Sequence, residues 1–339
     1  PIRKIHVSDR GHFGAARIDH AEEGVEALGY VVENRVMGRE LMASLGQQPG
    51  VELIAPATLV DFENGETAVI AEVSHDGEMR RMSARLMIAA DGTGSPVRRR
   101  LGINVVTEGY GQSALIANVG ISEPHRHVAF ERFTDSGPLA LLPMTSGEKQ
   151  AYRCSLVWTH RDAELPDTEA LDDAAFLARL QERFGYRLGR FTRVGKRASY
   201  PLALTRSTEF TRRRVAIVGN AAHTLHPVAG QGYNLALRDV ALIAELIAEA
   251  HRGGADIGGI NVLDAYEKGR TRDTRDVAFY TDTLVRLFSN ASPALGHARA
   301  AGLIAVDLVG PLRHWLARQN MGLRHTAPRL SRGLPLDSS

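Results

Sequence analysis

The stretch from residue 219 to residue 234 reads Gly-Asn-Ala-Ala-His-Thr-Leu-His-Pro-Val-Ala-Gly-Gln-Gly-Tyr-Asn. It follows the apolar run 215–218 and precedes an amphipathic pattern over residues 235–250. This order predicts a buried strand, a glycine-rich turn, and a helix whose first N–H groups have no partner within the helix. Those N–H groups carry the positive end of the helix dipole, so the turn suits an anionic or electron-rich ligand.

Gly230 and Gly232 leave the backbone of this turn bare, so that a flat ligand could lie against it. The alternative is an ordinary connection between a strand and a helix, in which the glycines only allow the chain to turn. A Gly-x-Gly pattern does not by itself decide between the two interpretations.

A second motif lies in residues 88–99, where Asp91 and Gly92 follow an apolar strand. Ligands of open α/β sheets bind at the carboxyl ends of strands, so Asp91 is well placed to meet one. The alternative is structural, because Asp-Gly is a common turn and Ser95-Pro96 can cap and begin a helix.

Taken together, the two motifs resemble the D-G and G-D fingerprints of the aromatic-ring hydroxylases built like para-hydroxybenzoate hydroxylase. In that family the second motif reads roughly G-D-A-A-H, a proline, then G-Q-G-x-N. Gly219-Asn220 and residues 223–227 are similar to the ubiquinone-biosynthesis branch of the family. The resemblance covers nearly the whole chain. It implies an α/β (α+β) fold with a β-sheet substrate domain and a helical C-terminal region.

The resemblance also implies FAD as cofactor, NAD(P)H as electron donor, and O2 and a polyprenylated phenol as substrates. Asn220 replaces the family's usual aspartate, which accepts a hydrogen bond from a ribityl hydroxyl; the amide oxygen can still accept one, but the charge is gone. We do not interpret this change as a loss of function. The residues that the resemblance places at the cofactor are Asn34, Asp91, Gly92, Gly219, Asn220, Pro227, Gly230, Gln231, Gly232 and Asn234.

No catalytic acid or base can be named from the pattern alone. His223 and His226 lie in the right loop, and a histidine could assist the deprotonation of a phenol. The alternative is that both histidines pack and cap the turn. His125 and His127 lack a convincing third ligand, so we expect no metal site.

Other functions remain open within the same resemblance. The chain could be a flavin hydroxylase of a soluble aromatic compound, or a related flavin halogenase or lipid reductase. The lysine motif expected of a halogenase is not found. A further alternative is a non-catalytic scaffold in an assembly with other ubiquinone-biosynthesis proteins.

The family's first motif, a strand followed by G-x-G-x-x-G, has no counterpart here, because Gly11 and Gly14 have the wrong spacing. We therefore expect the chain to start inside the flavin domain, without its first βαβ unit, and to bind FAD weakly or not at all. A stoichiometric yellow complex on titration with FAD would overturn this expectation.

The chain is expected to divide into four segments. Residues 1–105 and 206–260 would form the two parts of the FAD-binding domain, residues 106–205 the substrate-binding sheet, and residues 261–339 a helical region. Within the first part we predict three strands over residues 51–88, the last of them ending in an apolar run that is buried on both faces.

Composition narrows the class of protein. The 339 residues carry a net charge of +2, which gives no global support for binding nucleic acid. The arginine triplets at 98–100 and 212–214 are interpreted as solvated surface rather than as binding patches. The single cysteine, Cys154, fits a reducing cytoplasm.

We expect a cytoplasmic protein, with the inner face of the cytoplasmic membrane as its alternative location, since a polyprenylated phenol is a membrane lipid. No run of about 18 apolar residues predicts a membrane-spanning helix. Residues 303–318 combine apolar and basic side chains, which is typical of an interfacial amphipathic segment. The same pattern is also typical of a helix packed on its parent domain.

Overall fold

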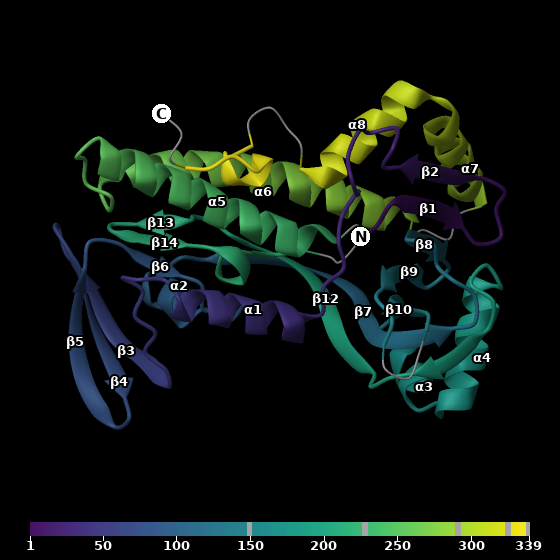
Figure 1. Ribbon diagram of the computed structural model, residues 1–339, viewed down its shortest axis with the longest axis horizontal. Coiled ribbons are helices and arrows are strands. Elements are labelled where there is room, and N and C mark those ends of the chain that lie inside the picture. Colours follow the sequence, from purple (N-terminus) through teal and green to yellow (C-terminus); the bar gives the residue numbers. More distant parts are fainter. Residues whose placement is uncertain (148–150, 226–229, 289–292, 323–326, 337–339) are drawn as a thin grey trace. The chain divides into compact units, whose positions relative to one another are not determined.

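The computed structural model is shown in Figure 1. It describes residues 1–147, 151–225, 230–288, 293–322 and 327–336. The described chain forms two compact units, each with its own hydrophobic core. Unit 1 consists of Pro1–Val32, Gly109–Leu202 and Thr281–Arg324, and unit 2 of Glu33–Glu108, Ala203–Tyr280 and His325–Ser339.

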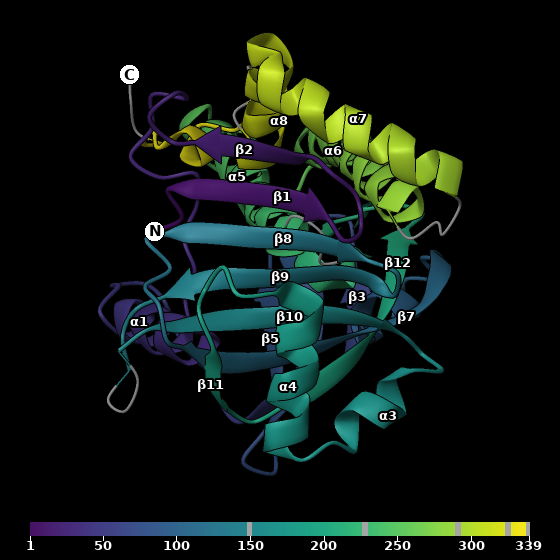
Figure 2. The same cartoon turned by 90° about the vertical axis from the view of Figure 1, so that its right-hand side faces the viewer.

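Unit 1 is built on a sheet with the strand order β7-β10-β9-β8-β1-β2, in which β11 also pairs with β7 (Figure 2). All neighbouring strands on this path run antiparallel except β1 and β8, which are parallel. The strands are β1 (Lys4–Asp9), β2 (Ala15–Asp19), β7 (Val105–Ile121), β8 (Val128–Thr134), β9 (Gly137–Met144), β10 (Arg153–Arg161) and β11 (Phe191–Val194).

Helix α4 (Asp173–Phe184) covers one face of this sheet, as Figure 2 shows. The Asp172 side chain caps the helix by accepting a hydrogen bond from the Ala175 N–H at 2.8 Å. The buried stripe of the helix packs with Trp158 and the other fully buried strand residues. Because side chains alternate along a strand, the residues between them project from the opposite face of the sheet. The short helix α3 (Leu165–Glu169) precedes α4.

The opposite face is covered in part by helix α7 (Pro293–Leu308), which is followed by α8 (Gly310–Met321). Leu303 packs with Ala16 and Phe133, and the buried Arg299 Nε lies 3.0 Å from Asp9 Oδ2. Helix α7 therefore lies against the β1–β2 side of the sheet, and it belongs to the helical C-terminal region that the resemblance implies.

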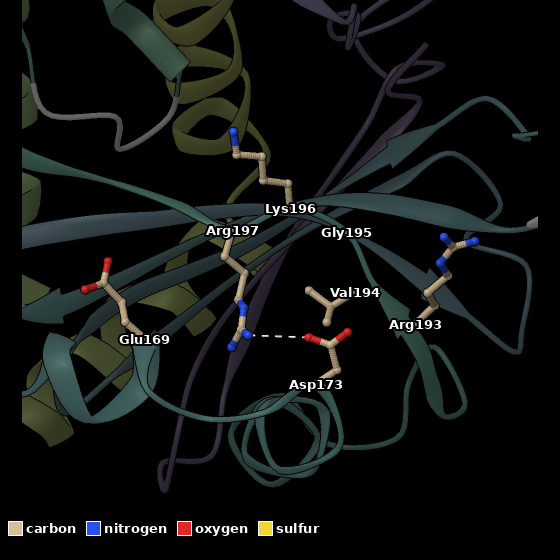
Figure 3. Close-up of a pocket in the computed structure, with 7 residues that line it drawn as sticks. All are labelled: Glu169, Asp173, Arg193, Val194, Gly195, Lys196 and Arg197. Carbon is tan, nitrogen blue, oxygen red and sulfur yellow. Dashed lines mark hydrogen bonds and ion pairs between the residues drawn. The ribbon is translucent and has the colours of Figure 1, made fainter.

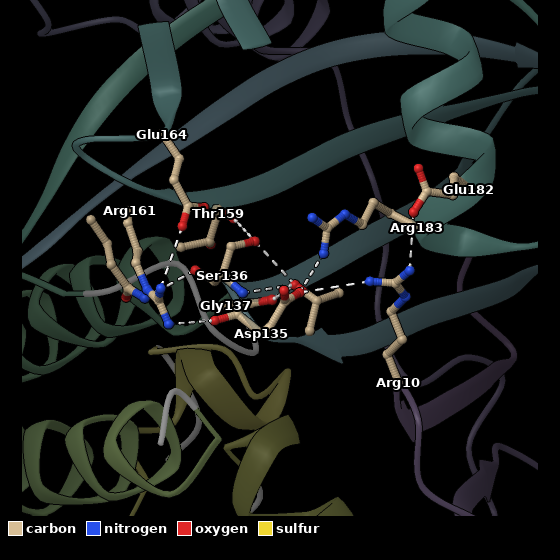
Figure 4. A network of polar contacts seen from close by, with 11 residues as sticks. Arg10, Asp135, Ser136, Gly137, Thr159, Arg161, Glu164, Glu182 and Arg183 are labelled. Atoms are coloured by element: carbon tan, nitrogen blue, oxygen red, sulfur yellow. Dashed lines mark hydrogen bonds and ion pairs between the residues drawn. The ribbon is translucent and has the colours of Figure 1, made fainter. Parts of the chain in front are cut away.

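A polar network closes one end of unit 1 (Figure 4). Asp135, in the turn between β8 and β9, forms ion pairs with Arg183 of α4 and with Arg10. Arg10 also pairs with Glu182 at 3.2 Å, while Arg161 donates a hydrogen bond to the Asp135 carbonyl at 3.0 Å. These contacts tie α4 and the end of β1 to the same turn.

Unit 2 contains a small sheet with the order β13-β14-β6, formed by β13 (Thr211–Arg212), β14 (Val215–Ile217) and β6 (Met87–Ala89). Helices α5 (Gln231–Arg252) and α6 (Ile260–Phe288) run alongside each other (Figure 1), and Ile243 and Tyr266 belong to the same core cluster as β14. This core holds the predicted strand–turn–helix in place.

A second sheet of unit 2 has the order β3-β4-β5. Its second hairpin turns at Asp76 and Gly77, both with positive φ, which an Asp-Gly dipeptide tolerates well. The remaining elements are β3 (Ala57–Asn64), β4 (Val69–His75), β5 (Glu78–Ala84), α1 (Asn34–Gly46), α2 (Pro96–Arg100), β12 (Ala198–Ser207), η1 (Gly219–Ala221), β15 (His223–Thr224) and η3 (Leu330–Arg332).

Two expectations need correction. The predicted third strand is in fact two strands, because β5 ends at Ala84 and β6 belongs to another sheet. β6 is an edge strand, so Ile88 is exposed and only Ala89 is buried. Residues 1–32, expected within the FAD-binding domain, join the other unit, because β1 pairs with β8 along its whole length.

Candidate active site

The two motifs found in the sequence leave the same edge of one sheet in unit 2. β6 and β14 are parallel, with Ala89 opposite Ile217, and the Val218 N–H donates a hydrogen bond to the Ala89 carbonyl at 3.0 Å. The Asp91 loop and the Gly219 loop follow directly. Because carboxyl ends of adjacent parallel strands lie side by side, the two loops form one surface.

Arg98 joins these loops through its side chain. It is only 5% exposed, and its guanidinium donates hydrogen bonds to the Ala221 carbonyl at 2.5 Å and to the Thr93 carbonyl at 2.9 Å. Burial lowers the pKa of Arg98 below the ordinary arginine value, and the nearby Asp91 carboxylate opposes the shift. The sequence-based interpretation of residues 98–100 as solvated surface is therefore wrong for Arg98.

Asp91 has the structural role that the sequence offered as one alternative, and its side chain is also exposed. Its Oδ2 accepts a hydrogen bond from the Val97 N–H at 3.1 Å, and Ser95 caps α2 by accepting one from the Arg98 N–H at 2.9 Å. The residue is nevertheless exposed, and Gly92 beside it has φ +85° with open space where a side chain would project. Asp91 thus stabilises its own loop and still presents a carboxylate to the surface.

Asp239 of α5, which is fully buried, holds the Gly219 loop from its buried side. Asp239 Oδ2 accepts a hydrogen bond from the Gly219 N–H at 2.8 Å and lies 2.7 Å from His223 Nε2. Arg270 Nε of α6 lies 2.6 Å from Asp239 Oδ1 and neutralises it. This buried cluster sets the path of the backbone that leads to the exposed Asn220.

Among the described residues, none covers the glycines at the start of α5. Gly230 caps the helix with φ +62° and no side-chain hydrogen bond, and a Cβ built on Gly230 or Gly232 would meet nothing within 4 Å. Tyr233 donates a hydrogen bond to Met37 Sδ at 3.2 Å, so the first turns of α5 and α1 are neighbours. Asn34 is the exposed first residue of α1.

These features fit the flavin that the motifs imply. Bare glycines, a helix N-terminus and exposed amide and carboxylate side chains suit a flat, polar, anionic cofactor. Unit 2 contains all the predicted cofactor residues that the structure describes, with Gln231 buried and Asn234 exposed. The predicted Pro227 and His226 lie outside the described residues.

His223, the other histidine considered for catalysis, is 1% exposed and bonded to Asp239. In this position it packs beneath the loop instead of facing a ligand. His125 Nε2 forms a hydrogen bond with the Met144 carbonyl oxygen at 2.9 Å. Among the described residues, no group of three His, Cys, Asp or Glu side chains is arranged to hold a metal ion.

Sequence reasoning missed Asp239 and Arg270, although a signal was available. Asp239 stands between Leu235 and Ile243 at four-residue spacing, on the buried stripe of α5. A charged residue at a core position requires a buried partner. Which cation supplies the partner cannot be read from the pattern, because Arg270 lies 31 positions further along the chain.

Unit 1 contains a separate pocket of about 570 Å³ (Figure 3). Charged side chains dominate its lining, and Arg197 faces Asp173 at 3.4 Å across it. A pocket with this lining does not suit a polyprenyl chain, so we place it outside the active site. Its lining residues are Glu169, Asp173, Arg193, Val194, Gly195, Lys196 and Arg197.

Comparison with known proteins decides the family. The model of the FAD binding domain family matches residues 15–279, which is more than half of the chain. The chain belongs to this family. Ubiquinone hydroxylase UbiL of Rhodospirillum rubrum is 41% identical, over 99% of this chain and 77% of its own length. 3-Demethoxyubiquinol 3-hydroxylase of Escherichia coli is 32% identical, over 90% and 76%.

Solved structures agree on the fold. p-Nitrophenol 4-monooxygenase PnpA from Pseudomonas putida matches with a TM-score of 0.74 at 18% identity, covering 94% of this chain and 80% of that one. PqsL of Pseudomonas aeruginosa, in complex with 2-aminobenzoylacetate, matches with 0.71 at 21%, covering 89% and 80%. The predicted fold class is confirmed, and the protein is an FAD-dependent monooxygenase. Among its described helices, none has both the length and the apolar character needed to cross a bilayer.

Proposed function

We propose that this monooxygenase hydroxylates the aromatic ring of a polyprenylated phenol in ubiquinone biosynthesis, such as a 2-polyprenyl-6-methoxyphenol, using NAD(P)H and O2. The observation that carries the proposal is the 41% identity to a ubiquinone hydroxylase over 99% of this chain. The overall reaction consumes the phenol, one O2, one NAD(P)H and one proton, and releases the hydroxylated phenol, water and NAD(P)+.

Bound FAD supplies the redox chemistry, taking electrons from NAD(P)H and activating O2. The residues of unit 2 hold and orient it. Asp91 and Asn220 offer acceptors for cofactor hydroxyl groups, and the backbone at Gly230–Gly232 would stabilise the negative charge that a bound flavin gains on reduction. Arg98 and Asp239 keep the two loops in register, so they act as positioning residues.

The substrate face of unit 1 supports a lipid-like substrate. Ile116 of β7, Val157 of β10 and Ala140 of β9 are directly opposite one another on neighbouring strands, on the face that α4 does not cover. None of the three is fully buried. A partly uncovered apolar face provides contact area for a prenylated ring.

The substrate is best tested by its own conversion. The FAD-loaded enzyme is incubated with NAD(P)H, 18O2 and a polyprenylated phenol, and the products are identified by mass spectrometry. We expect incorporation of one 18O atom into the ring. If the enzyme converts only soluble phenols, its substrate is a soluble aromatic compound and not a lipid. If a correctly folded protein forms no product, a role as a scaffold is favoured.

The polyprenyl substrate also requires access to a bilayer. Leu308, Val309, Leu312 and Trp315 are exposed where α7 ends and α8 begins, and Arg318 is exposed one turn further along. A cluster of exposed apolar side chains with an interfacial tryptophan and a cation suits an anionic membrane surface. We therefore propose peripheral membrane contact through this corner of unit 1.

Flotation with anionic liposomes tests the membrane contact. We expect the wild type to float and the double variant Leu312→Ser/Trp315→Ser to stay largely in the dense fraction. Tyr186→Ser is a matched control, because Tyr186 is an exposed aromatic residue of the same unit away from this corner. Equal flotation of all three proteins, or none by the wild type, would refute the proposed surface.

A further inference from the structure

One carboxyl group interrupts the apolar face of the unit 1 sheet. The strand register places five residues in a single row perpendicular to the strands, and they share the face that α4 does not cover. Four of them are apolar and the fifth is Glu131 of β8. The row consists of Ile116, Val157, Ala140, Glu131 and Val7.

The surroundings of Glu131 are apolar along its own strand as well. Ala129 and Phe133, two positions away on either side, share its face and are 5% and 3% exposed. Burial alone raises the pKa of Glu131 to about 7, and no neighbouring charge contributes to the shift. The side chain itself is half-buried, so the carboxyl group still reaches accessible space.

The charged groups on the elements packed around Glu131 already have partners. Asp9 of β1 faces Arg299 of α7 at 3.0 Å, and Asp307 of α7 pairs with Arg17 at 3.1 Å. On β9, the residues that share its face near Ala140 are Pro138 and Leu142, neither of which titrates. Among the described residues, none forms a hydrogen bond or an ion pair with the Glu131 carboxyl group, and desolvation is the one cause of its pKa shift.

A structural carboxylate in such surroundings would be paired, because desolvation of an ion without a partner is costly. A carboxyl group left without a partner on an apolar, partly open face is typical of a group that meets a ligand. Asp239, a fully buried carboxylate, has three partners. The difference indicates that Glu131 serves the substrate instead of the fold.

We infer that Glu131 binds the hydroxyl group of the aromatic substrate and accepts its proton; this inference rests on the proposed phenol hydroxylation. The phenolic O–H bond breaks, its proton moves to a Glu131 carboxylate oxygen, and the electron pair stays on the phenolate oxygen. The added electron density activates the ring carbon that is hydroxylated. After hydroxylation the ring hydrogen leaves to solvent as a proton, and Glu131 returns its proton to the product oxygen.

Kinetics of Glu131→Gln and Glu131→Asp test this role. We expect the Gln variant to lower kcat by about 10²–10⁴-fold, with KM for the phenol within about threefold of wild type. NAD(P)H oxidation would continue without product formation. The wild-type pH profile should show a limb near pH 7 that Glu131→Asp retains and Glu131→Gln lacks. Glu26→Gln is the matched control, because Glu26 is an exposed carboxylate of the same unit.

Wild-type kcat and an unchanged pH profile in Glu131→Gln would overturn the inference. A separate optical measurement needs no turnover: a nitrophenol probe is titrated into each protein at pH 7, and its phenolate absorption band is followed. We expect the wild type and Glu26→Gln to raise the phenolate absorbance above that of the same probe in buffer without protein, and Glu131→Gln not to raise it. If the wild type hydroxylates no polyprenylated phenol, the proposed function fails, while this titration still decides whether Glu131 takes a phenolic proton.

Discussion

In unit 2 the buried Asp239 faces Gly219, His223 and Arg270, whereas in unit 1 the half-buried Glu131 lies between the apolar residues Val7 and Ala140 of the neighbouring strands. A fully paired cluster rigidifies the backbone around it, and an unpaired group keeps its hydrogen-bonding capacity for a ligand. The comparison teaches that the cofactor loops are held by internal pairing, while the substrate face keeps a free carboxyl group. We expect mutation of Asp239 to lower the free energy of unfolding, and mutation of Glu131 to raise it at high pH.

The largest effect is expected at Asp239. Asp239→Ala removes the buried carboxylate that faces Arg270, His223 and the Gly219 N–H and leaves Arg270 only its second partner, Asp273, so the free energy of unfolding should fall by about 3–5 kcal/mol in urea titrations. Asp239→Asn, which keeps an acceptor for the Gly219 N–H, should lose less. The control is Asp264→Ala on the exposed side of α6, with a change below about 0.5 kcal/mol. Equal stability of Asp239→Ala and this control would contradict the pairing account.

The second largest effect is expected at Arg98. Arg98→Met removes the donors to the Ala221 and Thr93 carbonyls, and we expect a loss of about 1–3 kcal/mol in unfolding free energy together with weaker FAD binding. Stability is measured by urea denaturation, and affinity by the quenching of flavin fluorescence. Arg99→Met is the control, since Arg99 is exposed. If both variants bind FAD alike, Arg98 does not join the two loops in the way described.

At Glu131 we expect a mutation to raise the free energy of unfolding instead of lowering it. Its pKa is raised from 4.5 to about 7, so the folded protein keeps a proton that the unfolded chain releases. The stability contributed by this group is full below about pH 4.5 and is lost as pH rises through 7. Glu131→Gln should therefore be more stable than wild type at pH 8 by about 1–3 kcal/mol, with little difference at pH 4.5. Parallel stability curves over this pH range would show that the carboxyl group is not desolvated.

The smallest effect is expected at Tyr266, which is fully buried and donates a hydrogen bond to the Ile217 carbonyl at 3.0 Å. Burial raises the pKa of this phenol above its ordinary value. Tyr266→Phe should cost about 1 kcal/mol of unfolding free energy, because β14 loses one hydrogen bond and keeps its packing. Tyr200→Phe, at an exposed tyrosine, should have no measurable effect. A loss as large as that of Asp239→Ala would mean that the cluster is not the main support of the loop.

Local patterns predicted much of this molecule. The strand at Val215, the turn at Gly219 and the helix after Gly230 follow from apolar runs and glycines that lie next to one another in the chain. The hairpin at Asp76-Gly77 follows from the turn chemistry of that dipeptide. The family resemblance then supplied the fold class.

Contacts between segments far apart in the chain could not be predicted from the sequence. The parallel pairing of β6 with β14 joins segments more than 120 residues apart, and no local pattern encodes it. Arg98 and Arg99 look alike in the sequence, and only the position of the Ala221 carbonyl makes one of them buried. Glu131 is isolated because Val7 and Ala140 are its neighbours, and this follows from strand register rather than from its own surroundings in the chain.

Hydrogen exchange with and without FAD tests the central claim most directly. The concentration of FAD is raised until amide protection no longer increases, and the protection is measured by mass spectrometry. We expect protection in peptides that cover residues 91–98 and in those that cover residues 218–235, with none in β8 of unit 1. Protection in only one of the two loops, or in neither, would contradict a cofactor site built from both.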